Sequence, residues 1–267
     1  MRGEAFANAS YRLYAEQARR EGLPSVARIF ERAADVELNE HFPTEAKLSG
    51  QVKGDAANLR DAITGERYES RHMYPGFARE AQSTGDANAA NRFTEIAGDE
   101  AKHARAFDTA LRAVKSRSRS GSVPAAPVVH PVEVPAGPPM VRAQQTRENL
   151  DTALHGEALA YAKYRLYGQH AARPDVARLF RGTGEVELRE HLPETARLAG
   201  LVGTTHENLT KAIAGERYES QTMYPTFAKR AEAAGDTEAA RTFRHNARDE
   251  ARHARSFEKA RDRLSGS

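Results

Sequence analysis

The sequence predicts an all-α protein built from two four-helix units, and three observations support this fold class. Apolar residues make up 39% of the 267 residues and charged residues 29%, a balance typical of amphipathic helices. Apolar residues recur at helical spacing, and no segment shows the alternation typical of strands. Residues 25–108 match residues 175–258 at a constant offset of 150 positions, so the chain contains an internal repeat.

Each repeat is expected to form four helices. In the first repeat they cover about residues 4–20, 24–50, 57–83 and 87–114. Pro75 removes one hydrogen bond inside the third helix and predicts a kink there. The first helix of the second repeat covers about residues 146–172, so it starts some ten residues earlier than its counterpart.

A proline-rich segment separates the repeats. Residues 115–140 contain six of the twelve prolines, which favours an extended, semi-rigid linker. The expected domains are therefore a first repeat at residues 1–114, a linker at residues 115–140 and a second repeat at residues 141–267.

Composition excludes several classes of function. The chain has no cysteine, which excludes disulfides, cysteine-bound iron or zinc centres and thiol catalysis. No signal sequence or long apolar run is present, so we expect a cytoplasmic protein with no membrane partner. The net charge is +3, but basic and acidic residues alternate along the predicted helices. Such alternation is typical of solvated helix faces, so nucleic acid is not an expected partner.

A pair of glutamates in each third helix points toward the predicted core. Glu66 and Glu69, with Glu216 and Glu219 in the second repeat, are three residues apart and therefore share a helix face. An isolated carboxylate in an apolar interior is costly, so these acids need a compensating charge. Metal ions would provide it.

The other helices supply further metal-binding side chains. Each fourth helix contains Glu-x-x-His, and each second helix contains a glutamate four residues before a histidine. Each first helix adds a glutamate that follows a glycine. Five carboxylates and two imidazoles per repeat suit iron or manganese. Besides the paired glutamates of the third helices, these residues are Glu4, Glu37, His41, Glu100 and His103 in the first repeat, and Glu157, Glu187, His191, Glu250 and His253 in the second. Five histidines without a counterpart in the other repeat, His245 among them, are expected at the surface.

These motifs, followed by Met-Tyr-Pro in each third helix, resemble two tandem rubrerythrin-type ferritin-like modules without a rubredoxin domain. The resemblance implies two ferritin-like four-helix bundles and two di-iron centres. It implies Glu66, Glu100, Glu216 and Glu250 as bridging ligands. The implied terminal ligands are Glu4, Glu37, His41, Glu69, His103, Glu157, Glu187, His191, Glu219 and His253.

The resemblance also implies which residues are catalytic. In rubrerythrins the additional glutamate of the third helix, here Glu69 or Glu219, accompanies peroxide reduction. One iron moves between that glutamate and the histidine of the second helix. The positions where the family has tyrosines that orient carboxylates are here Tyr11, Tyr74, Tyr164 and Tyr224.

Two features depart from the family pattern. The family's second helix usually has Glu-x-x-His, whereas the spacing here is one residue longer. Either a π-bulge absorbs the extra residue, or Glu40 and Glu190 replace Glu37 and Glu187. The first repeat also begins only three residues before Glu4, so the site that uses Glu4 is expected to be the weaker one.

The loop between the second and third helices limits the architecture. About eight residues reach at most ~28 Å, whereas a 25-residue helix is about 37 Å long. The chain therefore forms either plain up-down-up-down bundles or bundles in which the first two helices of one repeat pack with the last two of the other. We favour this exchange, a domain swap within one chain.

The expected function is a non-haem di-iron oxidoreductase that reduces hydrogen peroxide or activates dioxygen. Three alternatives remain open: an oxygenase or oxidase acting on an organic substrate, a ferroxidase or iron-binding protein without redox turnover, and a purely structural helical protein. Because the chain has no cysteine-bound iron, the electron donor is expected to be a separate molecule. An oligomer is compatible with the sequence.

Overall fold

The computed structural model describes residues 1–116 and 122–265, and within these ranges every regular element is a helix. The first half contains α1 (Arg2–Arg20), α2 (Pro24–Val36), α3 (Phe42–Leu48), α4 (Asp55–Tyr68), α5 (Tyr74–Ser83) and α6 (Ala87–Lys115). The second half contains α7 (Gln144–His170), α8 (Pro174–Val186), α9 (Leu192–Ala199), α10 (Thr205–Tyr218), α11 (Tyr224–Ala233) and α12 (Thr237–Ser265). None of the described helices is long and apolar enough to cross a membrane.

Short π-helical turns interrupt the second and third helix of each repeat. They are η1 (Glu37–His41), η2 (Glu69–Met73), η3 (Glu187–His191) and η4 (Glu219–Met223). The two turns in the second helices confirm the predicted π-bulge. Glu40 is exposed and Glu190 accepts a hydrogen bond from the backbone of His130, so the alternative that these two glutamates face the site is wrong.

Proline accounts for the position of these turns. Each turn ends two residues before a proline, which has no N–H to donate to the carbonyl four residues earlier. The predicted kink at Pro75 therefore takes the form of a π-turn that begins at Glu69. In η3 the freed carbonyl of Arg189 accepts a hydrogen bond from the N–H of Val132, in the segment between the repeats, at 2.9 Å.

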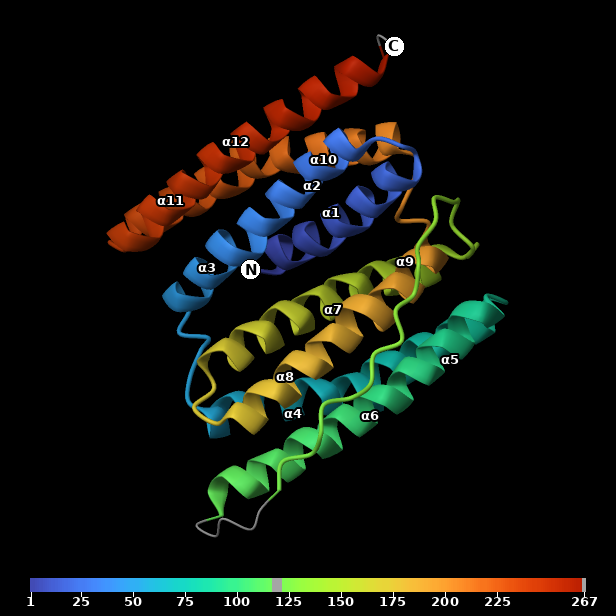
Figure 1. Ribbon diagram of the computed structural model, residues 1–267, viewed down its shortest axis with the longest axis vertical. Helices are drawn as coiled ribbons and strands as arrows, with labels where there is room; N and C mark the ends of the chain where they lie inside the picture. Colours follow the sequence, from blue (N-terminus) through green and yellow to red (C-terminus); the bar gives the residue numbers. More distant parts are fainter. Residues whose placement is uncertain (117–121, 266–267) are drawn as a thin grey trace.

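The helices form two bundles, and each bundle contains helices from both halves of the chain. Bundle I consists of α1–α3 with α10–α12, in the upper part of Figure 1, and bundle II consists of α4–α6 with α7–α9, in the lower part. The chain crosses between bundles in two short segments, residues 49–54 and 200–204. These crossings agree with the reach argument, because neither segment has to return along the length of its own bundle.

The two bundles are joined through α1 and α7. Small side chains on the two helices, including Ala5, Ala9, Ala158 and Ala162, are buried in one apolar cluster with Leu13. Small residues permit a close approach of helix backbones, so the two bundles share part of their core.

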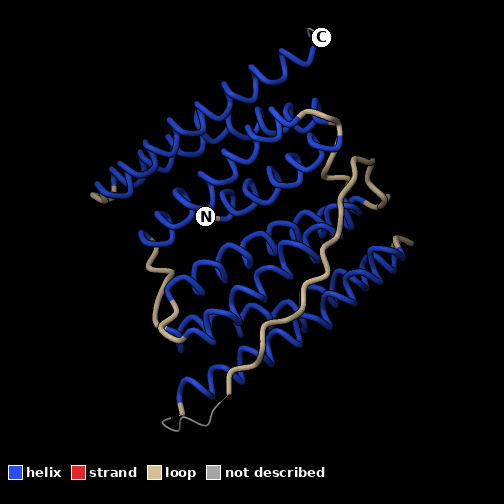
Figure 2. The backbone as a smooth tube through the Cα atoms, in the orientation of Figure 1, coloured by secondary structure: helices blue, strands red, loops and turns tan. Residues whose placement is uncertain are grey.

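The segment between the repeats runs across bundle II as an extended strap, drawn as a tan tube in Figure 2. Its backbone N–H groups at Gly137 and Met140 donate to the carbonyls of Val202 and Leu198, at 3.0 and 2.9 Å. Val134 is fully buried against the helices. Residues 117–121 of the expected linker lie outside the described residues.

Candidate metal centres

A cluster of acidic and imidazole side chains lies in the interior of each bundle. We define site I as the cluster in bundle I, made of Glu4, Glu37, His41, Glu216, Glu219, Glu250 and His253. We define site II as the cluster in bundle II, made of Glu66, Glu69, Glu100, His103, Glu157, Glu187 and His191. Every member was predicted from the sequence. In each site, three residues come from one half of the chain and four from the other.

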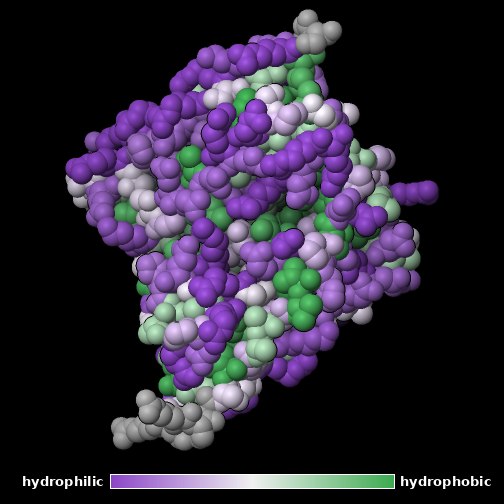
Figure 3. Space-filling model, in the orientation of Figure 1, coloured by the Kyte–Doolittle hydropathy of each residue, from purple (hydrophilic) through white to green (hydrophobic). Residues whose placement is uncertain are grey.

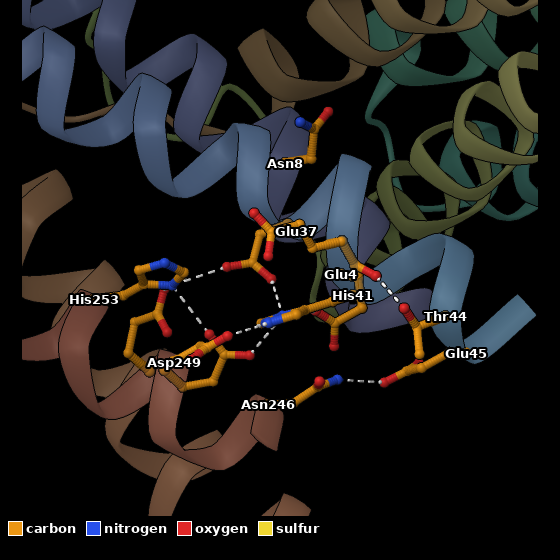
Figure 4. Close-up of polar contacts among 12 residues, drawn as sticks. Glu4, Asn8, Glu37, His41, Thr44, Glu45, Asn246, Asp249 and His253 are labelled. Atoms are coloured by element: carbon orange, nitrogen blue, oxygen red, sulfur yellow. Dashed lines mark hydrogen bonds and ion pairs between the residues drawn. The ribbon is translucent and has the colours of Figure 1, made fainter. Parts of the chain in front are cut away.

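In site I, two carboxylates lie between two imidazoles. The Nδ1 atom of His41 is 3.0 Å from Glu37 and 3.0 Å from Glu250. The Nδ1 atom of His253 is 3.1 and 3.0 Å from the same two carboxylates. Figure 4 shows Glu37 between the two rings. Glu4 completes a four-residue group on the His41 side, and Glu216 completes one on the His253 side.

Site II repeats this geometry. The Nδ1 atom of His103 is 2.8 Å from Glu100 and 3.1 Å from Glu187. The Nδ1 atom of His191 is 3.1 and 2.8 Å from the same two carboxylates. Two groups of four potential ligands therefore lie side by side in each bundle, which fits a pair of metal ions rather than a single ion.

This arrangement bears on which carboxylates could bridge two ions. The sequence analysis gave Glu66 and Glu216 bridging positions, but each of them belongs to only one four-residue group. Glu37 and Glu187 instead belong to both groups of their sites, together with Glu250 and Glu100. Glu37 and Glu187 each begin a π-turn, and one oxygen of each carboxylate faces each of the two imidazoles of its site.

The chemistry of the ligand set fits two iron or manganese ions. The side chains are almost completely buried, and both carboxylates and imidazoles are common ligands of these metals. Glu66 Oε2 and Glu216 Oε2 are buried and have no hydrogen-bond partner among the described residues. A buried carboxylate oxygen without a partner is costly, and a bound cation would satisfy it.

Without metal, the electrostatics show how closely the charges are packed. Burial, together with the charge of Glu4, raises the pKa of Glu219 to about 10. Burial and the charge of Glu100 raise the pKa of Glu69 to about 8. Burial lowers the pKa of His253, but its contacts with Glu216 and Glu250 outweigh burial and raise the pKa to about 12. Metal ions would displace protons from the members of the four-residue groups, such as His253.

Glu69 and Glu219 lie beside the metal groups rather than within them. Neither belongs to one of the four-residue groups. A Cβ atom added at Gly3 would lie 3.2 Å from Glu219 Oε1, and one added at Gly156 would lie 3.9 Å from Glu69 Oε1. The glycine before each first-helix glutamate therefore leaves space for the additional carboxylate of the third helix.

The four predicted tyrosines are buried, and each donates a hydrogen bond to a glutamate from the other half of the chain. Tyr11 donates to Glu216 at 2.6 Å and Tyr164 donates to Glu66 at 2.5 Å. The hydroxyls of Tyr224 and Tyr74 donate to the two first-helix glutamates, Glu4 and Glu157 respectively. Glu4 is buried and held by Tyr224, although it lies in the first turn of α1. The lower occupancy expected for its site stays a prediction.

The sequence analysis missed an aspartate beside one histidine of each site. Asp249 Oδ2 is 3.3 Å from His41 Nε2, and Asp99 Oδ2 is 3.6 Å from His191 Nε2. The hydrogen bond between His41 Nε2 and Asp249 orients that ring so that Nδ1 faces the metal groups, whereas Asp99 and His191 are in electrostatic contact without a hydrogen bond. The signal was present, because each aspartate immediately precedes the glutamate of Glu-x-x-His in both repeats.

The sequence of the chain is similar to those of several known proteins. The rubrerythrin family model matches residues 1–111 and 148–261. Rubrerythrin-2 of Clostridium acetobutylicum is 33% identical over 138 residues, which cover 46% of this chain and 75% of that protein. Rubrerythrin of Porphyromonas gingivalis is 35% identical, over 44% of this chain and 66% of that protein. Nigerythrin of Nitratidesulfovibrio vulgaris is 35% identical, over 39% of this chain and 58% of that protein. A crystal structure of symerythrin from Cyanophora paradoxa is 21% identical and covers 79% of this chain and 85% of its own, with a TM-score of 0.23.

Proposed function

The chain belongs to the rubrerythrin family, and from that premise we propose that it is a di-iron peroxidase that reduces hydrogen peroxide to water. The observation that carries the proposal is the pair of adjacent four-residue groups in each bundle, with one additional half-buried carboxylate beside them. The reaction consumes two electrons and two protons for each peroxide and releases two water molecules.

The residues of each site have distinct roles in this proposal. Glu37 and Glu250 in site I, and Glu187 and Glu100 in site II, would bridge the two ions. The remaining members of the four-residue groups would each bind one ion. Two ferrous ions, when bound, supply the two electrons that reduce the O–O bond.

The proton supply would come from the additional carboxylates and the tyrosines. In the absence of metal, the raised pKa values of Glu69 and Glu219 keep these side chains largely protonated at pH 7. Each lies beside its metal groups, where a proton is needed as the O–O bond breaks. Tyr11 and Tyr164 hold Glu216 and Glu66 in fixed orientations, so that the site is preorganised for the ions.

The cavities favour a small oxidant over an organic substrate. A groove of about 790 Å³ lies between α1, α2, α8, α9 and the strap, but none of the predicted ligands lines it. A substrate bound there would not reach a metal ion. Hydrogen peroxide needs no comparable cavity.

Stopped-flow oxidation of the iron-loaded, reduced protein by hydrogen peroxide tests the proposal. The double variant Glu69→Ala/Glu219→Ala is expected to bind iron and to react at least tenfold more slowly, because a positioned proton donor contributes about 10²–10⁴ in rate. Glu40→Ala/Glu190→Ala is a matched control, since these glutamates lie outside both sites. Equal rates for both double variants would reject peroxidase chemistry that depends on the additional carboxylates. Faster oxidation by dioxygen than by peroxide in the unaltered protein would instead favour an oxidase.

A further inference from the structure

The outer face of α12 carries a row of basic side chains. Its six members are all exposed and recur at intervals of three or four residues: Arg241, Arg244, Arg248, Arg252, Arg255 and Lys259. This spacing places them on one face of the helix, over a length of about 27 Å. Figure 3 shows hydrophilic side chains along the upper edge of the molecule, where Figure 1 places α12. We call this set the basic row.

The corresponding face of α6 does not carry this charge. The residues at the same positions of the first repeat are Asn91, Thr94, Gly98, Lys102, Arg105 and Thr109, of which only two are basic. Basic and acidic residues alternate along the sequence of α12, but the structure separates them. Two of its acids, Asp249 and Glu250, are buried toward site I. The excess positive charge on this face therefore belongs to α12 and not to its counterpart α6.

Most of the basic row is available to a partner. Arg244 pairs with Glu232, and Arg252 pairs with Asp249. Within the described part of the chain, the other four members form no ion pair. A row of unpaired cations attracts and orients an anionic partner.

A polar path leads from the basic row to site I. His245 lies between Arg244 and Arg248 and is exposed, and its Nε2 atom is 3.4 Å from Asp249 Oδ2. The same oxygen is 3.3 Å from Nε2 of His41, whose Nδ1 faces the metal groups. Figure 4 shows Asp249 joined to His41 across the edge of the site.

Site II has no equivalent path. The residue equivalent to His245 is Glu95, which forms an ion pair with Arg92 and does not contact Asp99 through an imidazole. Asp99 pairs with Lys102 at 2.6 Å, and its distance to His191 is 3.6 Å. The basic row and the path therefore occur together, on the same helix and in the same bundle.

Resting on the proposed function, which requires an external reductant, we propose that the basic row is the docking surface of an acidic one-electron carrier protein and that electrons reach site I through His245, Asp249 and His41. Each docked carrier is oxidised by one electron. Two dockings return the two electrons that one peroxide consumes, and two protons from solvent complete the balance. The basic row would also attract a nucleic acid, but nucleic-acid binding would not account for the polar path to the metal site.

Reduction kinetics with an acidic plant-type [2Fe–2S] ferredoxin test the docking surface. The charge-reversed variant Arg248→Glu/Arg255→Glu is expected to accept electrons from reduced ferredoxin about tenfold more slowly at low ionic strength, because electrostatic steering raises association rates. High salt should remove the difference. The matched control is Arg105→Glu/Arg112→Glu, which makes the same charge change on α6 and should alter the rate less than twofold. Reduction by dithionite, which needs no docking surface, should be equal in all three proteins.

A second variant tests the path separately from the surface. His245→Gln should bind ferredoxin as tightly as the unaltered protein in calorimetric titration of the metal-free chain. Its site I iron should nevertheless be reduced by ferredoxin at least fivefold more slowly, so the fast phase that site I gives in the unaltered protein should be lost. A fast phase equal to that of the unaltered protein would overturn the assigned path.

Three outcomes decide the proposal. A lower rate of reduction by ferredoxin in the α12 variant alone supports the proposal, and equal rates for the α12 and α6 variants overturn it. Loss of binding to a labelled 30-base-pair duplex by the α12 variant, with unchanged ferredoxin kinetics, would assign the row to nucleic acid and also overturn it. Peroxide oxidation of the dithionite-reduced protein involves no docking, so its absence would reject the peroxidase function without bearing on these results.

Discussion

Sites I and II each contain five glutamates and two histidines at equivalent positions of the repeats, yet the surroundings of the two sites differ. Site I has an additional acid, because Glu45 lies beside Tyr224 with its oxygen 2.9 Å from the tyrosine hydroxyl. The equivalent residue near site II is Thr195, whose hydroxyl is buried and has no hydrogen-bond partner among the described residues.

The outer coverage of the two sites differs as well. The strap lies over η3, where it donates a backbone hydrogen bond to Arg189 and another to Glu190. At η1 the residue equivalent to Arg189 is Asn39, and its side chain accepts a hydrogen bond from Arg165 of α7 at 2.9 Å. The comparison shows that the repeats supply the same ligands, whereas the strap and the residues that differ between the repeats determine how each site is covered.

The largest expected effect is on iron content, and it tests which residues share a site. The double variant Glu37→Ala/Glu250→Ala removes two ligands of site I and should lower the iron content from about four ions per chain to about two. Glu37→Ala/Glu100→Ala removes one bridging carboxylate from each site and should leave almost none. Elemental analysis after anaerobic loading measures both. If the second variant instead retained two ions, the ligands of each site would come from one half of the chain.

Removal of metal should have the next largest effect, on thermal stability. The metal-free protein must keep four buried carboxylates in each site, and a fifth that is half-buried, without cations, so chelation should lower the melting temperature. A ligand present at 1,000 times its Kd stabilises a protein by about 4 kcal/mol per site. Calorimetry should show about half of the full shift in Glu37→Ala and in Glu187→Ala, which each retain one site. An identical melting temperature with and without chelator in the unaltered protein would contradict metal binding at both sites.

The metal-free protein should also lose stability as pH rises. Burial raises the folded-state pKa of Glu69 to about 8 and that of Glu219 to about 10, both above the unfolded value of 4.5. Their contribution to stability is therefore complete below about pH 4.5 and is lost as pH rises through these folded-state values. Glu219→Gln stays neutral, so its urea midpoint should fall less than that of the unaltered protein between pH 5 and 9. Parallel pH profiles for the two proteins would show that Glu219 is already ionised in the metal-free fold.

The smallest expected difference concerns the two glycines that precede the first-helix glutamates. Gly156→Ala should raise the free energy of unfolding by about 0.5–1 kcal/mol, because alanine favours a helix and its Cβ meets Glu69 only at ordinary contact distance. Gly3→Ala places a Cβ 3.2 Å from Glu219 and should weaken iron binding at site I severalfold. Urea unfolding and competitive iron titration measure the two effects. Equal behaviour of the two variants would mean that Glu219 moves aside freely.

Most of the site could be predicted because its residues occur twice in the same order. Glu-x-x-His in α6 and α12 and the paired glutamates of the third helices carried the prediction. The π-turns at η2 and η4 were missed, although Pro75 and Pro225 mark them as clearly as Pro43 and Pro193 mark η1 and η3. The sequence could not predict which carboxylates belong to both ligand groups of a site, because helical spacing says which face a carboxylate occupies but not how far its two oxygens reach.

The sequence by itself determined the helices, the repeat and the identity of the clustered side chains, because these depend on local spacing and on burial of charge. Only the tertiary structure decided which helices share a bundle, which carboxylates lie between the two imidazoles, and that the basic residues of α12 form one exposed row. These features depend on contacts between residues about 200 positions apart, such as Tyr11 and Glu216. Local spacing carries no information about such contacts.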